Sequence, residues 1–259
     1  MDPDLSIGVD GIFTFWGQLP PSEFGFVVGP DGLEGITDGV AAKGQTVPRP
    51  GAHGDFELPT YLDSRIVSIS GTCLAESPQD LKQWGEAFTG LLVGRVGKIT
   101  MDHLGDVRWG RAGLAPGTQK KFKVHGVDSL SADFHIQLKF SNPRFFGDSK
   151  TFGSGEFAYH YGNFASAPVH TVTGNMPGGY AIDGPNFKQF RVLAPLVPGH
   201  PHTVDMNTGH LSIDGVVVFG FVQRADTWAI PGGGQVIHYL TPITTGTGTI
   251  ASVVPSVYV

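Results

Sequence analysis

The sequence predicts an all-β fold with one helix, built as two β-sandwich domains in a row. Its length of 259 residues suits two domains. A helical spacing of apolar residues occurs in one stretch only, and the second half consists of short strand-like runs between turns. We expect a first domain at residues 1–150 and a second at 151–259, divided near the Gly- and Ser-rich stretch 147–155. Length alone would also allow one large sandwich.

The composition argues against several classes of function. The net charge is −6, and the densest basic cluster, Lys120, Lys121 and Lys123, is too weak to follow a nucleic-acid backbone. The lone Cys73 rules out an internal disulfide framework. No apolar run approaches the ~18 residues of a membrane span. The acidic start at residues 1–4 lacks the basic beginning of a secretory signal, so we expect synthesis in a cytoplasm.

Charged residues make up only 15% of the chain, well below the usual quarter. Such a surface suits a protein that covers much of itself with contacts to other chains. A β surface covered by Ser, Thr and Gly explains the same composition equally well.

In the first domain, residues 12–16 and 24–28 are apolar strand pieces, and 65–70 is a strand rich in β-branched residues. The stretch 44–59 is rich in Pro and Gly and is predicted to be a loop.

A helix is predicted over about residues 77–93. Ser77 suits the N-cap, Pro78 the first helical position and Gly94 a stop. One apolar stripe recurs at helical spacing: Leu81, Trp84, Phe88 and Leu91. Burial should stabilise by about 1.5–3 kcal/mol for each of these side chains. Replacement of Trp84 by Ala should therefore harm folding more than any surface change.

A hairpin follows at about residues 98–114. Its turn lies at 103–106, and four apolar residues flank the turn: Ile99, Met101, Val107 and Trp109. The strand at 133–140 alternates apolar and polar residues, so one face should be buried and the other solvated. The strand ends at Asn142-Pro143-Arg144, where proline forces the chain out of regular structure.

The second domain shows no helical period after residue 156. The predicted strands are 169–173, 180–182, 187–193, 203–206, 210–213, 216–222, 227–230 and 235–241. Asn207-Thr208-Gly209 and Asp214-Gly215 are hairpin turns. Many short strands at even spacing are typical of a sandwich or barrel.

The order of these signals resembles a known family. In the first half they are the strand 64–71, the helix, the hairpin and the strand that closes on Phe140-Ser141-Asn142-Pro143-Arg144. In the second half they are Gly162-Asn163, Pro168, Val172-Thr173-Gly174, the strand at Leu193, Val204-Asp205, the following hairpin, Trp228 and the run 231–237. Each motif is weak alone, and the specificity lies in their order. From about Arg49 to Thr241, the chain is similar to the distal tail proteins of long-tailed bacteriophages and to the minor tail proteins that fill this role in phages of actinobacteria.

The resemblance implies a structural protein of the phage tail tip, made in the host cytoplasm and carried in the virion. The first domain would form a ring of six copies that caps the tail tube and holds a hub or fibre protein. The second would be a galectin-like sandwich. We expect structural roles for Arg65, Trp84, Phe88, Pro143, Arg144, Trp228, Pro231 and Gly232. Asn142 departs from the acidic residue that is frequent before the Pro-Arg pair, and the first fifty residues match little.

A ring needs a head-to-tail contact, and exposed sheet edges need a partner. The hairpin at 98–114 is our candidate for the arm that reaches a neighbouring copy, through Ile99, Met101, Val107 and Trp109. An ordinary core hairpin of the same domain explains the pattern equally well.

No motif predicts catalysis, a cofactor or a metal site. The chain has no Gly-x-Ser-x-Gly elbow, and the run 231–234 lacks the Lys-Ser/Thr of a phosphate loop. His200-Pro201-His202 has no third ligand at a recognisable spacing, which favours a solvated loop. Asp183, Asp205 and Asp214 would serve a glycosidase only if they lay a few ångströms apart, and aspartates in turns need no catalytic explanation.

Glycan binding is the rival function. A galectin-like sandwich could hold a host cell-wall sugar on aromatic rings, and Tyr159, Tyr161 and Tyr239 are the candidates. Trp228 is also aromatic, but it follows the strand pattern and is expected in the core. Similarity of fold does not transfer a binding site.

Overall fold

The computed structural model describes residues 4–20 and 22–259, so the first three residues of the acidic start lie outside the described residues. The chain divides into two units, one that ends at Phe145 and one that spans Phe146–Tyr258. The described residues are mostly β-strand, with α1 (Pro78–Gly90) as their one α-helix. The predicted all-β class with one helix is confirmed.

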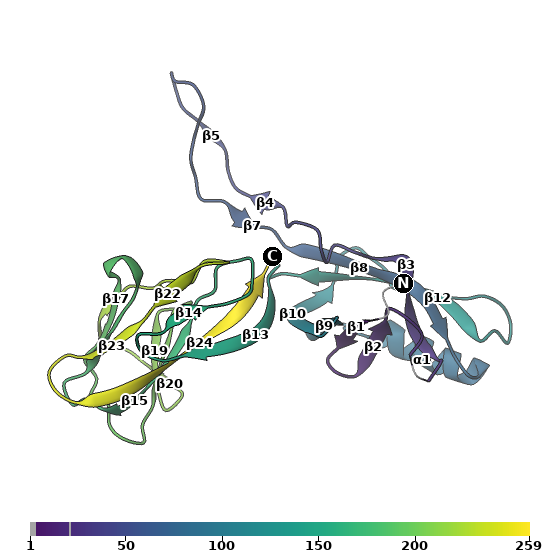
Figure 1. The fold of residues 1–259 in the computed structure, drawn as a ribbon. Coiled ribbons are helices and arrows are strands. Elements are labelled where there is room, and N and C mark those ends of the chain that lie inside the picture. The colour runs from purple at the N-terminus through teal and green to yellow at the C-terminus, as the bar shows by residue number, and fades with distance from the viewer. Residues whose placement is uncertain (1–3, 21) are drawn as a thin grey trace. The chain divides into compact units, whose positions relative to one another are not determined.

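The strands of the first unit form a sheet whose order closes on itself (Figure 1). They are β1 (Leu5–Val9), β2 (Phe13–Trp16), β3 (Gly25–Glu34), β8 (Arg65–Leu74), β9 (Gly97–His103), β10 (Asp106–Leu114), β11 (Lys121–Val124) and β12 (Ser131–Phe140). The order is β11-β12-β8-β3-β2-β1-β9-β10, and β10 also pairs with β12. The pair β2–β3 is parallel, whereas β8–β12 and β9–β10 are antiparallel. This closure leaves β11 at an edge.

An extended pairing joins β8 to β12, from Arg65 opposite Phe140 to Leu74 opposite Ser131. Along β12 the buried side chains are Ala132, Phe134, Ile136, Leu138 and Phe140, and the residues between them are half-buried or exposed. The predicted half-buried strand at 133–140 is therefore confirmed.

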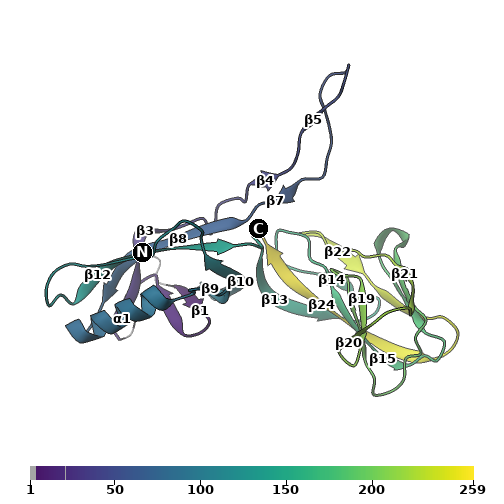
Figure 2. The same ribbon diagram turned by 180° about the vertical axis from the view of Figure 1, so that it is seen from behind.

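The helix α1 lies against the strands of the first unit (Figure 2). Ser77 caps its start, because its Oγ accepts a hydrogen bond from the amide of Asp80 at 3.1 Å. The helix ends at Gly90, before the predicted stop at Gly94, because the backbone of Leu91 is extended at φ −61° and ψ 128°. Within the described range, no helix combines the length and apolar content that a membrane crossing requires.

An aromatic cluster fills the core of the first unit. Its members are Phe13, Phe15, Phe26, Phe88, Phe122 and Phe134. The rings of Phe26 and Phe88 stack with their centres 5.6 Å apart, and those of Phe15 and Phe134 lie 5.4 Å apart. Phe88 is fully buried, whereas Trp84 is half-buried at the margin of the cluster, with its ring 6.3 Å from Phe26. Phe88 is thus the main aromatic contribution of the helix to the core.

The second unit contains two main sheets. The first has the order β13-β24-β15-β18-β19-β20, and its strands are β13 (Phe145–Phe152), β24 (Thr247–Tyr258), β15 (Val169–Asn175), β18 (His202–Asp205), β19 (His210–Ile213) and β20 (Val216–Val218). The second sheet has the order β21-β17-β16-β23, with β21 (Val222–Ala225), β17 (Gln189–Val192), β16 (Tyr180–Asp183) and β23 (Tyr239–Pro242). A separate ribbon pairs β14 (Phe157–Tyr159) with β22 (Gln235–Ile237).

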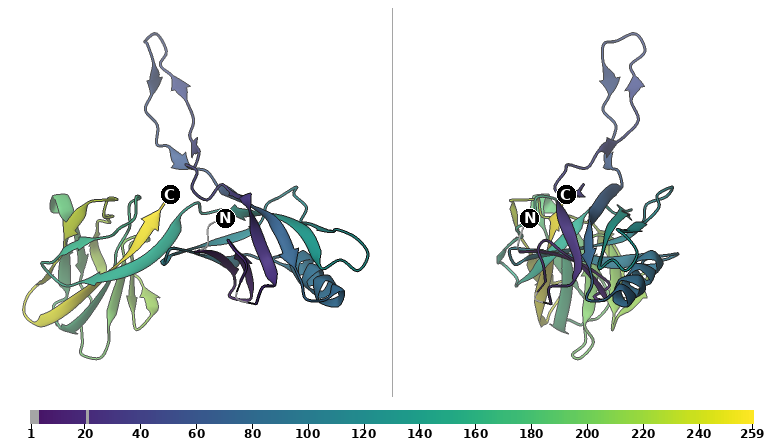
Figure 3. Two further views of the ribbon diagram at one scale, coloured as in Figure 1. Left: turned by 45° about the vertical axis from the view of Figure 1, so that its right-hand side comes forward. Right: turned by 90° about the vertical axis from the view of Figure 1, so that its right-hand side faces the viewer.

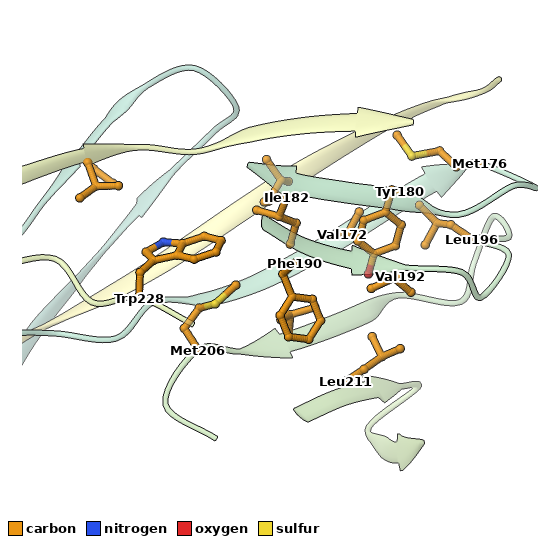
Figure 4. Close-up of a cluster of buried hydrophobic side chains, with 14 of the residues drawn as sticks. Val172, Met176, Tyr180, Ile182, Phe190, Val192, Leu196, Met206, Leu211 and Trp228 are labelled. Carbon is orange, nitrogen blue, oxygen red and sulfur yellow. The ribbon is translucent and has the colours of Figure 1, made fainter. Parts of the chain in front are cut away.

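Apolar side chains from both sheets meet in one core (Figure 4). Val172 and Leu211 come from the first sheet, and Tyr180, Ile182 and Phe190 come from the second. All five are buried, so the second unit has the layered core of a β-sandwich.

Several stretches of the second unit differ from the predicted elements, among them the predicted strand 216–222, which is divided into β20 and β21 of different sheets. The strand β24 was not predicted, because Ser252 and Ser256 lie on its buried face and weaken the apolar alternation. Most of the Gly- and Ser-rich stretch 147–155 belongs to the strand β13. The stretch 227–230 is not a strand, and only Ile230 forms a bridge there, opposite Ser166.

Candidate functional site

A two-stranded arm, residues 41–62, leaves the body of the first unit (Figure 3). Its strand β4 (Ala42–Lys43) pairs with β7 (Tyr61–Leu62), and β5 (Val47–Pro48) pairs with β6 (Asp55–Phe56). All residues from 41 to 61 are exposed. The stretch 44–59, which was predicted to be a loop, forms part of this ribbon. Its Pro and Gly residues keep each strand pairing short.

The arm carries apolar side chains into solvent. Tyr61 is 67% exposed and Phe56 is 50% exposed, and Val47 and Leu58 are also exposed. The guanidinium of Arg49 lies 5.5 Å from the centre of the Phe56 ring. A lone two-stranded ribbon is at best marginally stable in water. The arm thus has the composition of a segment that docks on another chain.

Arg65 fixes the base of the arm. Its side chain is buried, and Nη1 donates hydrogen bonds to the carbonyl oxygens of Gly35, Ile36 and Asp38 at 2.8, 2.6 and 3.1 Å. Burial lowers the pKa of Arg65, and the Asp38 carboxylate opposes that shift. The guanidinium also lies 5.1 Å from the centre of the Phe145 ring. Arg65, for which we expected a structural role, links the chain that enters the arm to the strand that leaves it.

The hairpin at 98–114 does not project from the unit. Its strand β9 pairs with β1 on one side and with β10 on the other. Ile99 and Met101 are 1% and 6% exposed, so they face the core of their own unit and are not available to a neighbouring copy. Val107 is exposed and Trp109 is half-buried beneath the Lys98 ammonium. A ring contact by this hairpin stays a prediction for Val107 and Trp109 alone.

The turn at Asn142-Pro143-Arg144 is closed by the asparagine side chain. Asn142 Oδ1 accepts hydrogen bonds from the amide and from Nε of Arg144, at 3.3 and 3.0 Å. Pro143 is buried. Asn142 therefore supplies the acceptor that a carboxylate would supply at this position.

Trp228, Pro231 and Gly232 lie in one bend of the second unit, where Trp228 is buried and Pro231 and Gly232 are exposed. Trp228 is buried in the core, although it lies outside the strands. Gly232 passes so close to Asn163 that a Cβ would lie 2.5 Å from its carbonyl carbon. The carbonyl of Pro231 accepts a hydrogen bond from the amide of Gly234 at 3.0 Å. A side chain at Gly232 would push these two segments apart.

Tyr159 and Tyr161 form an exposed cluster with Lys150. Their ring centres lie 5.8 Å apart, and Lys150 Nζ lies 4.3 and 3.9 Å from them. Lys150 also donates a hydrogen bond to Tyr159 Oη at 3.0 Å. Hydrogen bonds with Tyr161 and Tyr159 raise the pKa of Lys150, and the hydrogen bond from Lys150 lowers the pKa of Tyr161. The ammonium thus covers ring faces on which a sugar would stack.

Tyr239 stands at a different place in the second unit. It lies on β23 in register with Asp183 of β16, and its side chain is 52% exposed. The three tyrosines proposed as a sugar platform are therefore split between the Lys150 cluster and the β16–β23 pair.

The other residues considered for chemistry are engaged in local contacts. His200 Nδ1 lies 2.6 Å from Oδ2 of Asp214 at the surface, whereas His202 is buried with Nδ1 3.3 Å from Tyr180 Oη. Asp205 caps its own turn by accepting an amide hydrogen bond at 2.8 Å. Across residues 4–20 and 22–259, no group of three or more His, Cys, Asp or Glu side chains is placed to hold a metal ion.

These features define a class of protein with two consecutive all-β units and an exposed ribbon on the first. The sequence matches no family model and no curated protein. The fold matches the crystal structure of the Dit protein (gp 19.1) of SPP1 with a TM-score of 0.74 at 13% identity, over 98% of this chain and 99% of that chain. That protein is called a paradigm of the hub adsorption apparatus in phages that infect Gram-positive bacteria.

Two structures of the phage P2 baseplate in its activated conformation, one with Ca and one with Sr, align with TM-scores of 0.47 and 0.48 at 9% identity. Each alignment covers 96% of this chain and 97% of the other. These two scores are too low to support a shared fold. The SPP1 match spans nearly the whole chain, so the chain has the fold of that Dit protein, and the predicted resemblance is confirmed at the level of the fold.

Proposed function

We propose that this chain is a structural component of a bacteriophage tail tip, where copies form a ring that joins the tail tube to hub or fibre proteins. The observation that carries the proposal is the match of nearly the whole chain to a distal tail fold. Because a fold alone does not transfer a function, the exposed arm supplies the physical argument.

The arm suits a head-to-tail contact between copies. Such a contact repeats around a ring when the rotation per copy closes. The short pairings of the arm leave backbone N–H and C=O groups on its outer edges, which a neighbouring strand would satisfy. Phe56 and Tyr61 are the exposed aromatic side chains that would anchor the contact.

In this proposal the role is non-catalytic, and the ring contains six copies. The second unit is a galectin-like sandwich, and the partners are the tail tube protein and a hub or fibre protein. The charged fraction of 15% suits a surface that is largely covered in an assembly, although it suits an ordinary β surface equally well.

Electron microscopy tests the proposed location and symmetry. Purified protein should form six-fold rings at high concentration, and labelled antibody should bind the tail tip of virions. A protein that stays monomeric at every concentration and is absent from virions contradicts the proposal.

A second candidate function is the binding of a host cell-wall glycan by the second unit. The observation that favours it is an exposed aromatic and polar surface around Asp183, where Tyr239 lies in register. A pull-down of the protein on isolated host cell walls tests it, since lack of retention on the walls would remove this candidate.

A further inference from the structure

The second unit contains an open polar cavity of about 620 Å³ beside its second sheet. Side chains that line it are Asp183, Asn186, Phe187, Lys188, Gln189 and Arg224. The volume lies within the range of small-molecule sites in proteins. None of these residues has a place in the ring contact proposed above.

The loop that forms one wall has a strained backbone. Asn186 and Phe187 are consecutive residues with φ of 54° and 59°, in the left-handed region that disfavours a side chain. Each such residue costs on the order of 1–3 kcal/mol, and such strain is concentrated at functional sites. The strain places the Phe187 ring in solvent, where it is 96% exposed. An exposed ring adds nothing to the buried core, which favours a binding role for the ring.

Polar contacts hold the strained loop in one conformation. Arg224 Nη2 donates a hydrogen bond to the carbonyl of Phe187 at 3.0 Å, while Arg224 Nε donates to Asp226 Oδ2 at 2.7 Å. Lys188 Nζ donates to the carbonyl of Thr227 at 2.7 Å. The wall of the cavity is thus ordered before any ligand arrives, which reduces the entropic cost of binding.

The start of the loop rests on the core. A Cβ on Gly184 would lie 2.7 Å from the Trp228 ring, so only glycine fits there without a shift. The Gly184 amide also donates to the carbonyl of Lys188 at 2.9 Å. Because the loop starts against the buried indole of Trp228, this packing fixes where Phe187 lies.

Acceptors and donors stand side by side on the floor of the cavity. Asp183 Oδ1 accepts a hydrogen bond from Gln189 Nε2 at 2.8 Å, and Oδ2 accepts one from Thr241 Oγ1 at 3.0 Å. An ionised carboxylate offers about four acceptor sites, so Asp183 keeps about two for a ligand. The Gln189 carbonyl oxygen adds another acceptor, and the Asn186 carboxamide adds both donors and an acceptor.

The charges around the cavity balance. Asp183 and Lys188 line it with opposite charges, and the Arg224 guanidinium is paired with Asp226. Such a site has no excess of cations to attract a phosphate or carboxylate group. The balance therefore favours a neutral polar ligand.

We propose that this cavity binds a neutral saccharide. The Phe187 ring would cover the C–H face of the sugar, while Asp183, Gln189 and Asn186 bond its hydroxyl groups. Sugar hydroxyls both donate and accept, and planar carboxylate and carboxamide groups bond neighbouring hydroxyls in pairs. This inference rests on the second candidate function and gives it a site, and it does not depend on ring formation.

Saturation-transfer NMR with free galactose, glucose, N-acetylglucosamine and rhamnose at millimolar concentration tests the inference. The proteins are the unmodified chain, Phe187→Ala, Asp183→Asn, and the matched control Phe219→Ala, whose ring is 78% exposed elsewhere in the same unit. At least one sugar should bind the unmodified chain and the control equally. Phe187→Ala should weaken that binding by about tenfold or more, and Asp183→Asn should weaken it severalfold.

The inference is overturned if no sugar of the panel binds, or if Phe187→Ala binds as well as the unmodified chain. It is also overturned if Phe187→Ala changes the particle size in light scattering and leaves sugar binding intact, since the loop would then be a subunit contact. Equal melting temperatures of the two phenylalanine variants exclude misfolding. If the protein forms six-fold rings but binds no sugar, the tail-tip proposal stays supported and the saccharide proposal is contradicted.

Discussion

The two units differ in the polar side chains that their cores enclose. Among the described residues of the first unit, the buried charged side chain is Arg65, and its core is otherwise apolar. The second unit buries four histidines: His160, His170, His202 and His238. The rings of His170 and His238 lie 4.7 Å apart, and His238 has no hydrogen-bond partner on either ring nitrogen within the described chain. We therefore expect acid to destabilise the second unit. The exposed arm, by contrast, is a feature of the first unit.

Acid should destabilise the second unit before the first. Burial and the neighbouring His238 lower the pKa of His170 to about 3, and burial lowers the pKa of His238 to about 4, from an ordinary value of 6.5. Below pH 6.5 the unfolded chain binds protons that the folded unit excludes, so stability is complete above pH 6.5 and decreases towards pH 4. The loss should approach about 1.4 kcal/mol per pH unit for each histidine, or roughly 6 kcal/mol for the two by pH 4.

Hydrogen exchange followed by mass spectrometry at pH 7 and in mild acid measures the two units separately. Peptides of β15 and β24 should lose protection first. Earlier loss of exchange protection in β8 and β12 would contradict the prediction that acid destabilises the second unit first.

Truncation in the aromatic core should affect the first unit alone. Phe88→Ala removes a fully buried ring from contact with Phe26 and should cost about 3–5 kcal/mol of unfolding free energy. Trp84→Ala should cost less, because Trp84 is half-buried. Urea unfolding of both variants makes the comparison. A larger loss for Trp84→Ala would show that the helix packs mainly through the indole.

Removal of the charge at the base of the arm should have an intermediate effect. Arg65→Met keeps much of the side-chain volume but leaves the carbonyls of Gly35, Ile36 and Asp38 without their donor, which should cost about 2–3 kcal/mol. Cleavage of the arm in limited proteolysis should also become faster. Lys82→Met, an exposed change on α1, is the matched control. Equal cleavage rates in the two variants would show that Arg65 does not hold the arm.

Strong periodicity made part of the fold predictable from the sequence. The apolar stripe of α1 and the alternation of β12 each repeat over several residues, and both elements are where they were predicted. The strand β24 was missed because Ser252 and Ser256 occupy its buried face, so its pattern does not read as apolar.

The candidate sites were harder to predict, for three physical reasons. The alternation of Ile99 and Met101 in the sequence suits a core hairpin and a contact between copies equally well, and the structure shows both side chains buried in their own sheet. The arm shows no such alternation, because no second layer of its own chain covers it. Phe187 was predicted to begin a strand, and nothing in its side chain signals a left-handed backbone. The preceding Asn186, a residue type that tolerates that conformation, was the available hint.

The smallest expected effect on stability, and the most direct test of the central claim, comes from the arm. Phe56→Ser with Tyr61→Ser should change the unfolding free energy by less than about 0.5 kcal/mol, since both side chains are exposed. Val127→Ser with Leu130→Ser, which alters exposed apolar residues elsewhere in the first unit, is the control. The measurement is light scattering coupled to size-exclusion chromatography over a range of concentrations. The account predicts rings for the unmodified chain and the control and monomers for the arm variant, whereas identical particles for all three would contradict it.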